Sequence, residues 1–155
     1  MSMEIYVLSD TQLASIEAWQ RAIDAEGFRL KLSKETSIEA LRGHLPAWWG
    51  EKYAGFECDH WNAAELMDEL PEVVFEHQWK YALAFRWGAD LNACQGAYMA
   101  ATAYARATNG VILDCEEGKL LSPQRALELT QKIESDLPAI EQALRNVVKK
   151  IAPGG

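Results

Sequence analysis

The chain has 155 residues, which is long enough for one domain with a substantial core. Its apolar content of 49% excludes an intrinsically disordered chain. The formal net charge of −8 and an isoelectric point near 4.9 disfavour attraction to nucleic-acid phosphates and to anionic lipid. We therefore expect no nucleic-acid or membrane partner, one globular domain over residues 1–151, and a frayed tail over residues 152–155.

Three features bear on where the protein works. The longest stretch without a charged residue, 91–105, contains polar residues and is too short to span a bilayer. The first nine residues lack the positive region and apolar run of a secretory signal. Cys58, Cys94 and Cys115 are odd in number and widely spaced, so they predict neither a disulfide framework nor a zinc knuckle. Cytoplasm is the expected location.

The first elements expected are a strand, a helix and a second strand. Residues 4–9 are mostly apolar on both faces, as in an inner strand. A helix capped by Asp10 or Thr11 should follow and end at Gly27. Residues 28–33 alternate between apolar and polar side chains, which predicts a half-buried strand.

The next region predicts short elements. Residues 36–43 read as a short helix closed by Gly43, and residues 44–50 read as a loop because they contain a proline and a glycine. Residues 56–61 predict a strand with Phe56 and Cys58 on one side and Glu57 and Asp59 on the other. Asn62 should cap a short acidic helix that ends near Leu70.

A strand with one bulky face and one alanine-rich face is predicted over residues 79–87. The bulky face consists of Trp79, Tyr81, Leu83, Phe85 and Trp87. Asp90 should then cap a long helix that runs to about Thr108 and is unusually rich in alanine. Because small side chains permit close approach, we expect this helix to lie on the alanine face of the preceding strand.

The C-terminal part predicts a short strand over residues 111–114 and then helices. Ser122 and Pro123 favour a helix start, and Pro138 predicts a break or kink in the helical pattern near Asp136. Beyond the proline, six apolar residues form a stripe: Leu137, Ile140, Leu144, Val147, Val148 and Ile151. We expect the core of the chain itself to cover the stripe, with a second copy of the chain, in a homodimeric structural domain, as the alternative.

Strand–helix–strand, repeated later in the chain, predicts an α+β fold. The expected form is a ferredoxin-like or related α/β sandwich with a mainly antiparallel sheet and extra C-terminal helices. A flavodoxin-like parallel sheet is the main competitor. It is less favoured because two of the predicted strands alternate between apolar and polar side chains, whereas the strands of a buried parallel sheet are apolar throughout.

The strongest functional signal is a run of negative charge among aromatic residues. Between Tyr53 and Trp79 the chain carries seven carboxylates and no Lys or Arg. A one-sign field beside large rings is typical of a surface that attracts and then holds a basic protein. The pair Trp48 and Trp49 lies nearby in the sequence, and exposed tryptophan is typical of binding hot spots.

The alternative is a small enzyme that uses Cys58 and His60 with nearby carboxylates. A thiol beside an imidazole could act as a nucleophile. However, the more economical interpretation is a buried structural cysteine with a partly exposed histidine. The histidines lie in separate segments without metal-ligand spacing, and no phosphate-binding glycine motif occurs, so we expect neither metal nor cofactor.

Two stretches resemble small bacterial immunity proteins, which are encoded beside secreted toxins and neutralise them. They are residues 82–90 leading into the alanine-rich helix, and residues 108–114 followed by 118–120. The resemblance covers about 40 residues of the 155 and transfers no functional residue by position. It implies a binding role without catalysis.

The leading hypothesis is therefore a non-catalytic protein-binding module, an immunity protein that binds and inhibits the catalytic domain of a toxin. Its expected binding residues are Trp48, Trp49, Glu57, Asp59, Trp61, Glu65, Asp68, Glu69, Glu72 and Glu76.

Overall fold

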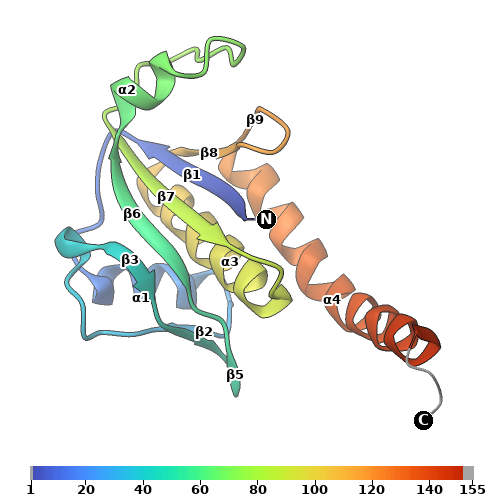
Figure 1. Cartoon of the computed structure of the whole chain (residues 1–155). Coiled ribbons are helices and arrows are strands. Elements are labelled where there is room, and N and C mark those ends of the chain that lie inside the picture. The colour runs from blue at the N-terminus through green and yellow to red at the C-terminus, as the bar shows by residue number, and fades with distance from the viewer. Residues whose placement is uncertain (1, 152–155) are drawn as a thin grey trace.

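The structure, a computed structural model, describes residues 2–151, so the predicted tail 152–155 lies outside the described residues. Four strands joined by two helices form the centre of the molecule (Figure 1). In chain order these elements are β1 (Met3–Ser9), α1 (Ile16–Ala25), β6 (Phe56–Asn62), β7 (Tyr81–Trp87), α3 (Leu91–Thr108) and β8 (Val111–Asp114). The strands lie in the spatial order β6-β7-β1-β8, and each neighbouring pair is antiparallel. This is the ferredoxin-like arrangement, and the expected α+β fold is confirmed.

The remaining elements are inserted into this centre or extend it. β3 (Arg42–Leu45) pairs with β6 and β9 (Lys119–Leu121) pairs with β8, which completes a six-stranded sheet. A separate three-stranded sheet contains β2 (Leu30–Leu32), β4 (Ala47–Trp49) and β5 (Lys52–Tyr53). The helical additions are a 3₁₀ turn (Ile38–Ala40), α2 (Ala63–Asp68) between β6 and β7, and α4 (Pro123–Ile151) after β9.

Both α1 and α3 cover one face of the six-stranded sheet. Trp19 of α1 is fully buried there, with its ring centroid 6.0 Å from that of Phe85, and its indole N–H donates to the Ala100 carbonyl at 2.9 Å. The opposite face is covered by α2, whose Leu66 and Met67 belong to a second, smaller apolar cluster. That second face is covered only in part, since Trp61 of β6 remains exposed.

The alanine-rich helix lies on the face of β7 opposite to the expected one. Leu83, Phe85 and Trp87 share a buried cluster with α3, whereas the alanine face packs against α2. Burial of the bulky side chains of β7 requires a larger apolar surface than the short α2 offers, and the long α3 provides it. Its small residues let it approach the sheet closely: a Cβ on Gly96 would lie 2.3 Å from the Ala54 carbonyl oxygen.

Three predictions for the N-terminal half are wrong. The first helix is capped by Ser15, whose hydroxyl accepts from the Ala18 N–H at 3.0 Å, because the Asp10 carboxylate is engaged instead by His77 and the Lys80 backbone. Residues 44–50 are not a loop but contain the second half of β3 and all of β4, with the proline between the two strands. Gly43, expected to close a helix, lies in β3 with a positive φ of 103°.

The C-terminal helix differs from expectation in two ways. It is one continuous helix through Pro138 rather than several, because the proline is exposed and water can reach the carbonyl left without an N–H donor. Leu137 is buried at 2% exposure, but Ile140, Leu144 and Val147 are 41%, 52% and 51% exposed. The core of the chain therefore does not cover these three stripe residues, and the side chains of Val148 and Ile151 lie outside the described residues.

Candidate binding face

The candidate site lies on the sheet face that points away from α1 and α3. Side chains alternate along β6, so Phe56 and Cys58 are buried beneath α3 while Glu57, Asp59 and Trp61 lie on the opposite side. This separation of side chains agrees with the sequence prediction. It brings one predicted aromatic anchor and two predicted carboxylates onto one rigid strand.

A row of charged side chains crosses this face over four strands. Glu4 on β1, Arg86 on β7, Glu57 on β6 and His44 on β3 are successive cross-strand neighbours. The Arg86 guanidinium Nε is 3.3 Å from Glu4 Oε2, and His44 Nδ1 is 3.7 Å from Glu57 Oε1. Glu4, Arg86 and Glu57 thus alternate in charge across three strands, and the contact between Glu57 and His44 extends the row to a fourth.

Trp61 lies beside this row, against Arg86. Its ring centroid is 5.5 Å from the Arg86 guanidinium carbon and 6.0 Å from the centroid of Tyr6, which meets it edge-on. Although these two contacts fix the indole, Trp61 remains 43% exposed. It is therefore an ordered aromatic surface that a partner can cover.

A second aromatic group lies at the His44 end of the row. Tyr53 stacks on His44 with ring centroids 5.9 Å apart, and its hydroxyl is hydrogen-bonded to His44 Nε2. Trp48 meets Tyr53 edge-on at 5.7 Å, and the two rings are 41% and 45% exposed. Gly55 is required beneath them, because a Cβ there would lie 2.6 Å from the Tyr53 hydroxyl oxygen.

Trp49 does not join this group. Adjacent residues of a strand point to opposite sides, so Trp49 packs partly against the core while Trp48 is exposed. The Lys52 ammonium lies over the Trp49 ring at 5.7 Å, and both residues line an open hollow of about 460 Å³ that also contains Arg29 and Glu134. The two neighbouring tryptophans thus serve two different surfaces.

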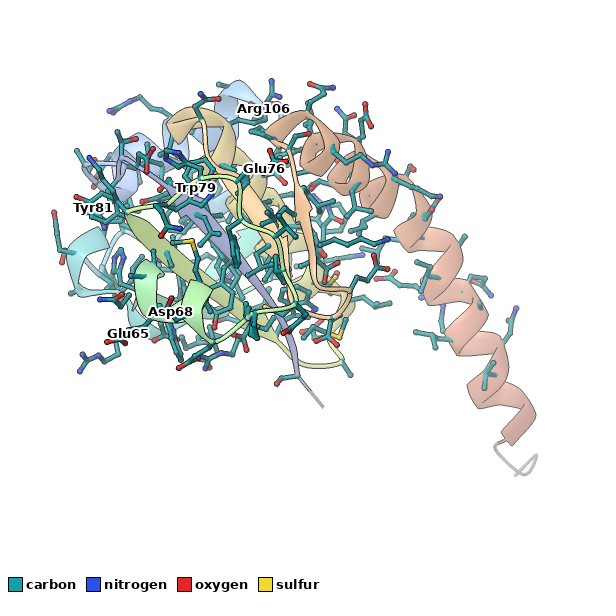
Figure 2. The ribbon with its side chains drawn as sticks, turned by 90° about the horizontal axis from the view of Figure 1, so that it is seen from above. Glu65, Asp68, Glu76, Trp79, Tyr81 and Arg106 are labelled. Atoms are coloured by element: carbon teal, nitrogen blue, oxygen red, sulfur yellow. The ribbon has the colours of Figure 1, made fainter. Side chains whose placement is uncertain are left out.

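The remaining predicted carboxylates follow Trp61 along the chain. Asn62 caps α2 by accepting from the Glu65 N–H at 2.9 Å, as expected. Figure 2 shows Glu65 and Asp68 on α2, and Glu76 in the segment that leads to β7. Five carboxylates here are exposed and, among residues 2–151, form no ion pair: Glu65, Asp68, Glu69, Glu72 and Glu76.

Asp59 has a structural contact of its own. Its carboxylate accepts a hydrogen bond from the Gly43 backbone N–H at 2.6 Å, which ties β3 to β6. The side chain is only partly exposed. One of its oxygens is therefore already engaged, unlike those of the carboxylates on α2.

We call this combined surface the acidic–aromatic face. It consists of Glu4, His44, Trp48, Tyr53, Glu57, Asp59, Trp61, Arg86 and the five carboxylates from Glu65 to Glu76. Tyr53 and Arg86 were not among the binding residues expected from the sequence, and His44 was considered only as a metal ligand. Their roles depend on which residues lie opposite one another on neighbouring strands. In the sequence, this register is indicated only by opposite charges on strands that are far apart in the chain.

Cys58 and His60 lie on the opposite side of β6 from this face. The Cys58 thiol is fully buried, and burial raises its pKa well above the ordinary value, which disfavours the reactive thiolate. His60 Nε2 is 2.7 Å from the Ile38 carbonyl oxygen, so the ring is held by the backbone. Among residues 2–151, no group of three or more His, Cys, Asp or Glu side chains is placed to hold a metal ion.

Comparison with protein-family models, with curated proteins and with solved structures gives no match to this chain. No helix among residues 2–151 is long and apolar enough to cross a membrane. The functional conclusion therefore depends on the geometry of the acidic–aromatic face.

Proposed function

We propose that the chain is a non-catalytic protein-binding module that binds a basic protein partner through the acidic–aromatic face. In its specific form, the proposal is an immunity protein in the cytoplasm that binds and inhibits the catalytic domain of a toxin. The immunity role extends the resemblance of residues 82–90, 108–114 and 118–120 to such proteins. The general binding role depends on the face alone.

One observation carries the proposal: two groups of exposed aromatic rings are held against the charged row, one at its His44 end and one beside Arg86. Trp48 and Tyr53 lie at the His44 end and Trp61 lies beside Arg86, each between 41% and 45% exposed. Ring contacts and sheet positions hold all three in place, so a partner could cover them without a large loss of side-chain entropy. Tryptophan and tyrosine are also the residues that most often dominate binding energy at interfaces.

The carboxylates of α2 and the following segment supply the second part of the argument. Five like charges without a basic neighbour raise the negative potential beside the aromatic rings. Such a potential accelerates the approach of a basic partner, while burial of the rings slows its departure. The basic surfaces of nucleic-acid-cleaving toxins have the matching charge.

The experiment begins with recovery of the partner from the native host, followed by binding kinetics at two salt concentrations. The test variant replaces Glu65, Asp68 and Glu69 by Lys, and the matched control replaces the exposed Glu17, Glu35 and Glu116 by Lys. Each set changes three side chains from a charge of −1 to +1, so the net charge of the chain changes from −8 to −2. The two proteins therefore differ in where the charge lies and not in its amount.

We expect the test variant to associate about ten times more slowly than the control at low salt, with the difference shrinking as salt rises. Trp48→Ala should instead raise the dissociation rate with little dependence on salt. Equal association rates for the test and control variants would show that the carboxylates of α2 play no part in partner recognition. A toxin as the recovered partner, with its activity blocked at a one-to-one ratio, would establish the immunity role.

A further inference from the structure

The apolar seam of α4 is a continuous heptad pattern that extends beyond the core. In the notation abcdefg, its a positions are Pro123, Thr130, Leu137, Leu144 and Ile151, and its d positions are Ala126, Ile133, Ile140 and Val147. Such a spacing of 3.5 residues is typical of a helix that packs along its length against another helix.

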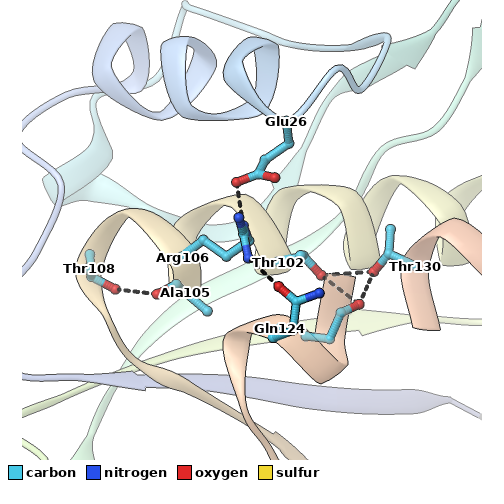
Figure 3. A network of polar contacts seen from close by, with 8 residues as sticks. Glu26, Thr102, Ala105, Arg106, Thr108, Gln124 and Thr130 are labelled. Carbon is cyan, nitrogen blue, oxygen red and sulfur yellow. Dashed lines mark hydrogen bonds and ion pairs between the residues drawn. The ribbon is translucent and has the colours of Figure 1, made fainter. Parts of the chain in front are cut away.

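The first half of this seam already has its partner helix within the chain. Ala126 and Thr130 are fully buried against α3, and the Thr130 hydroxyl is 2.8 Å from that of Thr102 (Figure 3). At the start of α4, Gln124 accepts from Arg106, which also pairs with Glu26 of α1. The contact with α3 is antiparallel, running from Arg106 with Gln124 to Tyr98 with Thr130. Leu137 is the last buried residue of the seam among the side chains described.

The second half of the seam continues past α3 without a partner helix. Figure 1 shows α4 extending away from the body of the molecule. Here Ile140, Leu144 and Val147 are 41%, 52% and 51% exposed on the same line as Leu137. At 1.5 Å per residue, the segment from Leu137 to Ile151 is about 21 Å long.

We propose that this projecting half of α4 pairs with the same segment of a second copy of the chain, in antiparallel orientation. From residue 136 to residue 151 the chain carries two acids, Asp136 and Glu141, and three bases, Arg145, Lys149 and Lys150, a net charge of +1, so a strongly acidic or basic partner gains little from charge here. A second copy, in contrast, repeats the same heptad seam and needs no further complementarity.

The orientation follows from the space along the seam. A parallel partner would continue along the seam into the first half of α4, where α3 already lies. An antiparallel partner overlaps only the projecting halves, and each globular body then lies beyond the end of the other helix. Leu144 would pack opposite Ile140 of the partner copy, and Leu137 opposite Val147 of the partner copy.

The size of the contact predicts a reversible dimer. Four apolar layers from Leu137 to Val147, over about 15 Å, bury less than the roughly 1,200 Å² of a standard stable interface. The dimer should therefore form at high concentration and dissociate on dilution. The proposal is independent of the proposed function, because α4 contributes no residue to the acidic–aromatic face.

The test measures the molar mass of the full-length chain by sedimentation or light scattering over a concentration series that reaches about 1 mM. The protomer mass is 17.4 kDa. The wild type should approach twice this mass, and Leu144→Glu should stay at the protomer mass throughout. Gln142→Glu places the same charge within the same turn but off the seam, so it should behave as wild type. Circular dichroism of all three chains checks that α4 remains folded.

Orientation is tested with single cysteines introduced in a Cys115→Ser background. Ala143 flanks the seam near the expected two-fold axis, so Ala143→Cys should cross-link to its counterpart on oxidation, whereas Asn146→Cys should not. A wild type that remains at the protomer mass at every concentration overturns the proposal. Dimerisation of Leu144→Glu as strong as that of the wild type would also overturn it, and cross-linking through Asn146→Cys alone would overturn the antiparallel arrangement.

Discussion

His44 lies directly opposite Glu57 across the antiparallel pair of β3 and β6, with its Nδ1 atom 3.7 Å from Glu57 Oε1. The other ring nitrogen of His44 is hydrogen-bonded to the Tyr53 hydroxyl, on the neighbouring small sheet. One imidazole therefore connects the acidic strand to the aromatic hairpin that carries Trp48. This connection makes the two predicted features, carboxylates and tryptophans, parts of one surface.

The first prediction tests this connection through Gly55. In Gly55→Ala the new methyl group would lie 2.6 Å from the Tyr53 hydroxyl oxygen and 2.8 Å from His44 Nε2, so the two rings must separate. We expect shifted NMR signals for both rings and a loss of about 1 kcal/mol in the free energy of unfolding. Gly88→Ala is the control, since a Cβ there meets nothing within 4 Å and its effect should stay within about 0.5 kcal/mol. Unchanged Tyr53 and His44 signals in Gly55→Ala would contradict the contact.

The second prediction compares two leucines of α4 that are one heptad apart. Leu137 is buried at 2% exposure, so Leu137→Ala should lower the free energy of unfolding by about 2–5 kcal/mol. Leu144 is 52% exposed, and Leu144→Ala should cost less than about 1 kcal/mol when unfolding is measured in dilute solution. Urea denaturation of both variants gives the comparison. Similar losses would mean that the core reaches further along α4 than the exposures indicate.

The third prediction concerns Gln95, a fully buried residue of α3. Among residues 2–151, neither polar atom of its side-chain amide has a hydrogen-bond partner. Because an unpaired buried amide is costly, Gln95→Met should raise the free energy of unfolding by about 1–3 kcal/mol. The conservative change Gln95→Glu should be strongly destabilising, since it buries a charge. A destabilised Gln95→Met would show that the amide is paired after all, for example through an internal water.

The fourth prediction uses thiol chemistry to test the enzyme alternative. Burial raises the pKa of the Cys58 thiol, and it raises the pKa of Cys94 to about 11, whereas Cys115 is exposed. Burial and a raised pKa leave little accessible thiolate, so Cys58 and Cys94 should react slowly with a disulfide reagent in the native protein, and more slowly than the exposed Cys115. In denaturant, all three should react at the rate of free cysteine. Rapid native labelling at Cys58, identified by mass spectrometry, would restore the enzyme hypothesis.

The central strands could be predicted because their patterns are local. The alternation in β6 and β7, the Asn62 and Asp90 caps and the Asn109 helix end each involve residues within a few positions of one another. The end of α1 at Gly27 has the same origin, with a positive φ of 78°. These features depend on backbone geometry and capping, which short sequences determine.

Several features could not be predicted because they depend on competition between distant segments. Asp10 was expected to cap the first helix. Instead, its carboxylate is hydrogen-bonded to His77 and to the backbone N–H of Lys80, in the segment before β7, and the helix begins later. Residues 44–50 became strands because β6 and β2 provide pairing edges that no local pattern reveals.

The acidic–aromatic face also has features that could be predicted from the sequence and features that could not. The sequence by itself determined that Glu57, Asp59 and Trp61 share one side of a strand and that α2 carries exposed carboxylates, since both follow from periodicity. Only the tertiary structure decided that Trp48 and not Trp49 joins them, and that Tyr53, His44 and Arg86 complete the face. The physical reason is that periodicity sets which side of an element a side chain occupies. Register and packing between elements set which side chains meet, and these depend on the whole chain.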